Sequence, residues 1–280
     1  MALFGLFNRA GNTKGEMSFW SHIDALRKHL FRSVIVVLIL AVVLFCFPEF
    51  LFDEVIFGPL NTDFPTYRAF CKLSHILELG DQLCFGTQTF KLQSLGLADQ
   101  FTSQMWIAFL GGLILGAPYV LWEVWRFIKP ALKEREKSAS SGFIIFSTLL
   151  FLMGVLFSYY IIVPLTVNFL GNYQVSERVQ NNFTMDSYIS TVTTLTIATG
   201  LVFELPIIVY FLTKFGLMSP EYMRKYRKHA VVVILVVAAV ITPSPDITSQ
   251  LLVAFPLYLL YEASIFVSYY VIKKKAANPL

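Results

Sequence analysis

Long stretches of this chain carry no charged residue. Residues 100–122 and 138–176 contain no Asp, Glu, Lys or Arg. An α-helix needs about 20 apolar residues to cross the roughly 30 Å hydrocarbon core of a bilayer. The pattern therefore predicts an all-α, polytopic membrane protein, because a soluble domain seldom contains apolar runs of this length.

The runs and the breaks between them predict six transmembrane helices. The third helix is expected to end near Pro164. The fifth run has only 12 residues before a Thr-Pro-Ser-Pro-Asp break, so the last two helices are expected to be short. They would be joined by a tight turn, and a re-entrant hairpin is the alternative. The expected spans are residues 30–47, 101–122, 143–163, 188–212, 230–241 and 247–272.

Lys and Arg are distributed unevenly between the two sides of this topology. With six spans, one side carries 18 of the 22 basic residues and the other carries 4. Cytoplasmic loops are enriched in Lys and Arg, so both termini are expected to be cytoplasmic. Residues 1–29 would form an amphipathic segment on the inner surface, and residues 273–280 a cytoplasmic tail.

The large loop 48–99 falls on the outer side in this topology. It contains Cys71 and Cys84, two of the three cysteines. An oxidising outer compartment permits a disulfide, but connectivity does not follow from sequence, so a disulfide and two free thiols both remain open.

Common catalytic motifs are missing from this sequence. The chain has no P-loop, no His-Glu-x-x-His zinc motif, no Cys-x-x-Cys pair and no Gly-x-Ser-x-Gly nucleophile turn. The sequence therefore predicts a protein that is not an enzyme, with no cofactor, no metal and no nucleic-acid partner.

Two places carry polar chemistry that the membrane pattern does not require. Glu204 lies inside the fourth predicted span, where a carboxylate costs roughly 3 kcal/mol on insertion scales, which favours a functional role over a purely structural one. Residues 123–137 combine aromatic side chains with Glu134 and Glu136. An aromatic ring and a carboxylate can bind a guanidinium together, although a solvated charge run explains the same segment.

Four motifs occur in order along the chain and resemble those of the TatC family. They are Ser-His-Ile-Asp-Ala-Leu-Arg at 21–27, Trp-Arg-Phe-Ile-Lys-Pro-Ala-Leu at 125–132, Phe-Glu-Leu-Pro at 203–206 and Thr-Pro-Ser-Pro-Asp-Ile-Thr-Ser-Gln at 242–250. Ser219-Pro-Glu221, with the basic run that follows it, also fits. The resemblance covers about residues 21–270, and six helices with a short last pair agree with it.

The resemblance implies a function and a set of site residues. The family binds twin-arginine signal peptides of folded proteins and works with single-span TatA- and TatB-type partners, in an oligomeric complex of the bacterial cytoplasmic (inner) membrane driven by the proton-motive force. Phe127 and Glu136 would line the signal-peptide site, to which Glu134, Asp24 and Arg27 are added as candidates. Partner contacts or the outer turn would involve Glu204, Pro206, Asp246 and Gln250.

The first motif departs from the family pattern. Ala25 stands where the family usually has Glu, and Asp24 lies one position earlier. Adjacent helical residues point about 100° apart, so Asp24 does not simply replace that Glu. Two arginines call for two carboxylates, and we expect Glu136 to bind one and Asp24 or Glu134 the other.

A proton-coupled secondary transporter using Glu204 is the alternative function. It would move a substrate without partner proteins, and it would need more polar residues at the midplane than this sequence contains.

Overall fold

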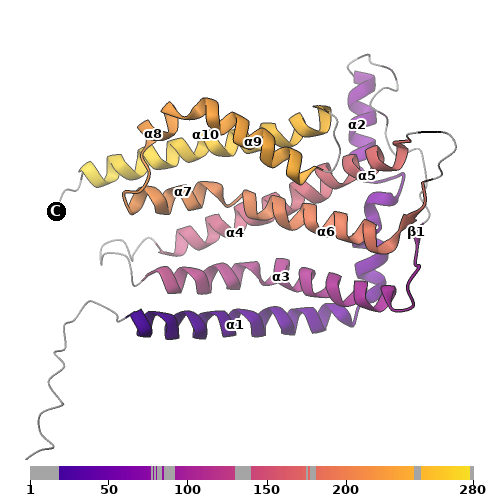
Figure 1. The fold of residues 1–280 in the computed structure, drawn as a ribbon, viewed down its shortest axis with the longest axis horizontal. Coiled ribbons are helices and arrows are strands. Elements are labelled where there is room, and N and C mark those ends of the chain that lie inside the picture. The colour runs from indigo at the N-terminus through magenta and orange to yellow at the C-terminus, as the bar shows by residue number, and fades with distance from the viewer. Residues whose placement is uncertain are drawn as a thin grey trace, which may run out of the picture.

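Long helices lie side by side in this computed structural model (Figure 1). It describes residues 19–76, 78, 80, 84, 92–129, 140–174, 176, 181–242 and 247–277. The start of α1 and the end of α10 lie at the same end of the bundle, on the left of Figure 1, and α2 stands at the opposite end. The helices are α1 (Phe19–Phe45), α2 (Pro65–Ile76), α3 (Asp99–Ile128), α4 (Ser140–Phe157), α5 (Val163–Asn172), α6 (Met185–Val202), α7 (Leu205–Lys214), α8 (Pro220–Lys225), α9 (Arg227–Ile241) and α10 (Ile247–Ala277).

Five helical segments of the described residues are long and apolar enough to cross a membrane. They are Ile23–Phe45, Asp99–Ile128, Ile144–Asn172, Met185–Lys214 and Gln250–Lys274. The expected helix at 230–241 is present as α9, but its 15 residues rise only about 22 Å.

The prediction that both of the last helices are short is wrong for α10. This helix has 31 residues and includes Pro256. It continues through Lys273 and Lys274, because lysine is a good helix former and no glycine or further proline interrupts the run. Only α9 is therefore a short member of the pair.

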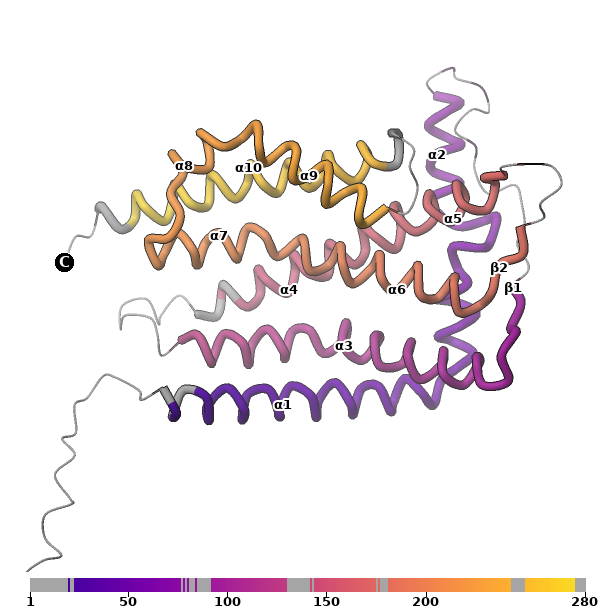
Figure 2. The backbone as a smooth tube through the Cα atoms, viewed as in Figure 1, coloured from indigo at the N-terminus to yellow at the C-terminus, as the bar shows by residue number. Residues whose placement is uncertain are grey.

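One expected boundary is also wrong. The third long helix does not end at Pro164: a π-helical segment, Ser158–Ile162, leads into α5, where Pro164 occupies the first turn (Figure 2). The N–H that Pro164 lacks would have faced the carbonyl oxygen of Tyr160, which accepts a hydrogen bond from the Thr66 hydroxyl instead. Residues 1–18 of the expected amphipathic segment lie outside the described residues, and from Phe19 onward the segment is helical and continuous with the first span in α1.

The fourth expected helix is divided in two. The α-helical pattern stops after Val202 and resumes at Leu205, leaving Phe203 and Glu204 in a turn. Pro206 explains the break, because it has no N–H to donate to the carbonyl oxygen of Val202, four residues earlier, and its ring crowds that carbonyl. Glu204 therefore occupies the N-cap position of α7.

The described parts of the loop between α1 and α3 contain several short elements. After α1 come a π-helix (Phe50–Ile56), a 3-10 turn (Gly58–Leu60) and α2, and strand β1 (Leu92–Gln93) precedes α3. β1 pairs in parallel with β2 (Phe183–Thr184), which precedes α6. This small sheet was not expected, and it ties the chain before α3 to the chain before α6.

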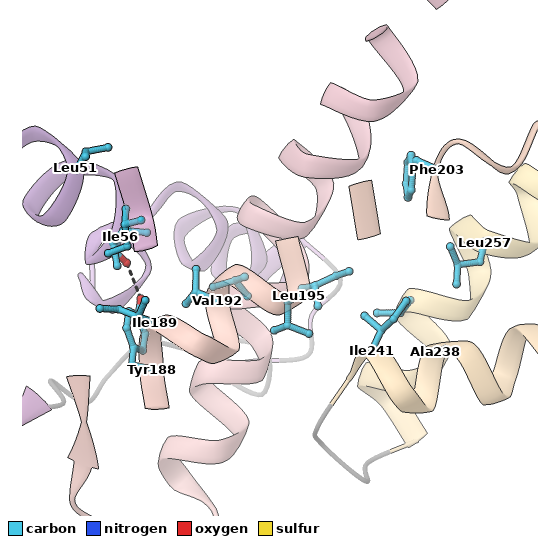
Figure 3. Close-up of a cluster of buried hydrophobic side chains, with 14 of the residues drawn as sticks. Leu51, Ile56, Tyr188, Ile189, Val192, Leu195, Phe203, Ala238, Ile241 and Leu257 are labelled. Carbon is cyan, nitrogen blue, oxygen red and sulfur yellow. Dashed lines mark hydrogen bonds between the residues drawn. The ribbon is translucent and has the colours of Figure 1, made fainter. Parts of the chain in front are cut away.

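One apolar cluster connects this loop to the last helices (Figure 3). Tyr188 of α6 donates a hydrogen bond of 2.7 Å to the carbonyl oxygen of Ile56, which is drawn as the dashed line. The same cluster continues through α6 to α9 and α10, where Ala238 and Leu257 are almost completely buried.

Candidate functional site

A buried carboxylate joins α1 to α3 at the end of the bundle where α1 begins. Glu123 is only 1% exposed. Its Oε2 pairs with Nδ1 of His29, and its Oε1 accepts a hydrogen bond of 2.9 Å from the hydroxyl of Tyr119. The guanidinium of Arg126 lies 3.6 Å from Oε1. Buried charges are tolerated when they are paired and hydrogen-bonded in this way.

Phe127 lies next to this carboxylate cluster. Its ring centroid is 6.3 Å from that of His29, in an edge-to-face arrangement. The guanidinium of the adjacent Arg126 lies 4.7 Å from the ring centroid of Trp122, about one turn earlier on α3. The end of α3 therefore already holds one guanidinium over an aromatic ring, which is the chemistry that an arginine ligand requires.

The other predicted members of this site are only partly described. Asp24 and Arg27 are exposed on the first turns of α1, and Ala25 is half-buried between them. Glu134 and Glu136 lie outside the described residues, so their distance from Phe127 is not defined.

Glu204 is buried next to α4. It is 9% exposed, and its Oε2 accepts a hydrogen bond of 2.8 Å from the hydroxyl of Ser147. Its Oε1 has no hydrogen-bond partner within the described part of the chain. The backbone comes close at this break, because a Cβ added to Gly154 would lie 2.8 Å from Cβ of Phe203. Pro206, the other predicted residue here, is buried in the first turn of α7.

Gln250 has a structural contact of its own. Its Nε2 donates a hydrogen bond of 3.0 Å to the carbonyl oxygen of Leu235 and so ties α10 to α9. Asp246 lies outside the described residues. The structure thus gives Gln250 a role in pairing the last two helices, whether or not it also meets a partner protein.

Sequence reasoning did not identify His29 and Glu123 as site residues. Glu123 directly follows a charge-free run and resembled an ordinary span boundary. The spacing of Tyr119 and Glu123 is a helical i,i+4 pair and could have been noticed. The partner on α1 is 94 residues away in sequence, and no local pattern predicts that contact.

At the opposite end of the bundle, Cys71 and Cys84 form a disulfide. Nε2 of His75 lies 3.8 Å from Sγ of Cys71. These three side chains have the donor atoms of a metal site, but a disulfide provides no thiolate ligand. The disulfide is instead a covalent closure of the segment that follows α2.

Known proteins match almost the whole chain. The family model described as Sec-independent protein translocase protein (TatC) matches residues 21–256. The Sec-independent protein translocase protein TatC of Blattabacterium sp. subsp. Periplaneta americana (strain BPLAN) is 42% identical over 94% of this chain and 99% of the relative. The TatC protein of Aquifex aeolicus (strain VF5) is 33% identical over 92% of this chain and 98% of the relative.

Solved structures agree with these matches. Two crystal structures described as the twin-arginine translocase receptor TatC superpose with TM-scores of 0.65 and 0.67, each at 33% sequence identity. They cover 90% and 88% of this chain, and 99% of the solved chain in both cases. With its five long apolar helices, the protein is therefore a multi-pass membrane protein that belongs to the TatC family of Sec-independent protein translocase components.

Proposed function

We propose that this protein is the receptor subunit of a twin-arginine translocase and binds signal peptides at the end of the bundle where α1 begins and α3 ends. The observation that carries the proposal is the position of Phe127 beside the buried His29–Glu123 pair. That pair fixes α1 against α3, so the aromatic ring is held on a rigid support. Binding groups on such a support need less ordering when a ligand arrives.

The binding step follows from the charges of the two partners. The two guanidinium groups of a twin-arginine motif require carboxylates, because bidentate arginine–carboxylate pairs are the strongest contacts available to them. We assign one arginine to Glu136 and the other to Asp24 or Glu134, with Phe127 supplying the aromatic surface. Glu123 has three partners of its own, which supports a positioning role for it.

Export in this proposal depends on further components. The chain would cross the bacterial inner membrane six times, with both termini in the cytoplasm and α9 as the short fifth crossing. It would recruit single-span TatA- and TatB-type partners, with Glu204 as the intramembrane polar contact, and the proton-motive force would drive passage. The unpartnered Oε1 of Glu204 supports this assignment, because a buried acceptor is stabilised by a donor from a second molecule.

The same oxygen favours one rival function. A proton-coupled transporter would use Glu204 without partner proteins. Purified protein in vesicles would then move a small substrate by itself when a proton gradient is applied. The receptor proposal expects no such flux.

Photocrosslinking tests the receptor proposal directly. A photoreactive phenylalanine analogue at position 127, which keeps the aromatic ring and all assigned carboxylates, should crosslink a twin-arginine signal peptide in membranes, and a twin-lysine peptide should crosslink about tenfold less, since lysine lacks the bidentate contact. Equal crosslinking of the two peptides by folded, inserted protein would refute the proposal.

Two single substitutions separate the assigned carboxylates. Glu136→Ala should reduce crosslinking at position 127 well beyond the effect of Glu134→Ala. Asp24→Asn then tests the second position, because it removes a charge from α1 without changing the size of the side chain. Equal effects of Glu136→Ala and Glu134→Ala would contradict the assignment of Glu136.

A further inference from the structure

A polar groove lies between the first turns of α3 and α6, far from the site proposed above. It has a volume of about 380 Å³, which lies in the usual range for small-ligand sites. It is near the β1–β2 pair, because each strand directly precedes one of the two helices. Thr102, Ser103 and Trp106 line it from α3, and Asp186, Ser190 and Thr193 line it from α6.

Not all polar groups of the groove have a hydrogen-bond partner in the described part of the chain. Ser103 is only 4% exposed, and its hydroxyl has no hydrogen-bond partner among the described residues. Asp186 is exposed, and no hydrogen bond or ion pair from the described chain involves its carboxylate. By contrast, Trp106 donates a hydrogen bond of 3.4 Å to the hydroxyl of Thr193. A buried hydroxyl without a partner calls for one from outside the chain.

The order of these groups along the helix axis limits what can bind. Asp186 is the second residue of α6 and lies at the start of the apolar segment Met185–Lys214, where an interface of a bilayer would be expected. Thr193 lies seven residues further along, or about 10 Å deeper. The groove therefore has a carboxylate at its mouth, hydroxyl groups below it and the ring of Trp106 beside them. Asp186 lies near a helix N-terminus, where a negative charge is favourable. That position does not explain the hydroxyl groups that lie deeper in the groove.

We infer that this groove binds the headgroup of an ammonium-bearing phospholipid such as phosphatidylethanolamine. The ammonium group would pair with Asp186 at the mouth. The phosphate and ester oxygens would accept hydrogen bonds from the Ser103 and Ser190 hydroxyl groups, and the acyl chains would pass the Trp106 ring. The ammonium, phosphate and acyl parts of such a lipid follow the same order as the carboxylate, hydroxyl and aromatic groups of the groove. Tryptophan commonly lies at this depth of a membrane.

Lipid retention in nanodiscs tests the inference with the full-length protein. Protein purified from nanodiscs of mixed phosphatidylethanolamine and phosphatidylglycerol would be analysed by native mass spectrometry. We expect wild type to retain phosphatidylethanolamine in preference to phosphatidylglycerol. Asp186→Asn should reduce that retention by about tenfold, as expected for the loss of a charge-assisted hydrogen bond.

Two further variants make the result specific. Asp53→Asn removes an exposed carboxylate of the loop after α1, outside the groove, and should retain phosphatidylethanolamine like wild type. Ser103→Ala removes the unpartnered hydroxyl and should give a smaller loss than Asp186→Asn. Each variant is checked for an unchanged thermal midpoint.

Three results would overturn the inference. Equal retention of the two phospholipids by wild type would remove the preference for an ammonium group. Unchanged retention in Asp186→Asn would show that the lipid binds outside the groove. A loss in Asp53→Asn equal to that in Asp186→Asn would show the same.

Discussion

The hydroxyl of Ser147 on α4 donates a hydrogen bond of 2.8 Å to Oε2 of Glu204, in the turn that separates α6 from α7. The second oxygen of the same carboxylate has no partner in the described chain. Glu204 is thus fixed by one oxygen and has the other left for a further donor. We therefore expect export to depend more on Glu204 than on Ser147.

Substitution of the two residues tests that difference. Glu204→Ala should lower export of a twin-arginine cargo by more than about tenfold, because it removes both oxygens from a buried site. Ser147→Ala should lower export by only about threefold, since the carboxylate remains. Cargo in the outer compartment is measured in cells in which the variant is the only copy, at equal amounts of membrane protein. Equal losses would assign the effect to the Ser147 contact instead of the unpartnered oxygen.

The His29–Glu123 pair should contribute far more stability than the exposed pair Arg227–Glu262. His29→Ala leaves Glu123 buried without its main partner and should cost about 3 kcal/mol. Arg227 is 47% exposed, and its nitrogen lies 2.7 Å from Glu262, so Arg227→Ala should cost less than about 1 kcal/mol. Thermal unfolding in detergent measures both.

A double substitution identifies the cause of the larger loss. If the penalty in His29→Ala comes from an unpaired buried carboxylate, adding Glu123→Gln should recover part of the lost stability. A double variant that loses the sum of the two single effects would indicate lost packing instead.

Gly112 allows the close approach of α1 and α3. A Cβ at this position would lie 2.8 Å from both the backbone nitrogen of Ala41 and the carbonyl oxygen of Val37. Backbone atoms cannot move aside as a side chain does, so Gly112→Ala should destabilise the protein by about 1–3 kcal/mol. Gly142→Ala is the matched control, because nothing lies within 4 Å and alanine favours a helix. A higher thermal midpoint for Gly112→Ala than for Gly142→Ala would contradict this explanation.

The Cys71–Cys84 disulfide should restrict the chain between its two cysteines. It closes a loop with a sequence separation of 13, for which loop entropy predicts about 3 kcal/mol. Before reduction, a thiol-alkylating reagent under denaturing conditions should modify one cysteine, Cys46; after reduction it should modify three. Reduction should also speed proteolysis of this segment. Three alkylated cysteines without prior reduction would show that the disulfide is absent.

Tyr67 should make the anchoring of α2 sensitive to high pH. Its hydroxyl donates hydrogen bonds to the carbonyl oxygens of Pro59, at 2.8 Å, and Pro164, at 3.3 Å. Burial raises the pKa of Tyr67 from 10.0 to about 12. The neutral form is thus favoured in the folded state, and this stabilisation is complete below pH 10 and decreases as the pH rises through about 12.

The comparison with Tyr67→Phe isolates this residue. The thermal midpoint of wild type should exceed that of Tyr67→Phe by a constant amount up to about pH 9, and the difference should shrink above pH 10, because only the wild type can lose the proton. Other tyrosines titrate in both proteins and cancel. A difference that is the same at pH 8 and pH 11 would contradict the assignment.

The sequence predicted the long helices well because a charge-free run of this length rarely occurs outside a membrane-spanning helix. The predicted helix boundaries are wrong where the helix changes its hydrogen-bonding pattern. Pro164 looked like an end, but it follows a π-helical segment in which the helix continues. Pro206 was expected within one continuous span, but the helix is interrupted just before it, between α6 and α7.

Single residues of the candidate site could be predicted from the sequence more readily than the residues that they contact. Glu204 was identified from its cost in a membrane, but Ser147, its partner, is one of many serines in apolar helices. The pairing of His29 with Glu123 and that of β1 with β2 both join segments about 90 residues apart. Such contacts are set by how helices pack, and no periodicity in a single sequence encodes them.

Helix pairing in this bundle follows chain order to a large extent. α1 contacts chiefly α3, α4 contacts α6, and α10 contacts α7 and α9. The α1–α3 hairpin can therefore assemble while the ribosome is still making the rest of the chain. α10 follows α7 in the chain and packs against it, so a chain that stops before Ile247 would leave an uncovered helix surface for membrane proteases to recognise.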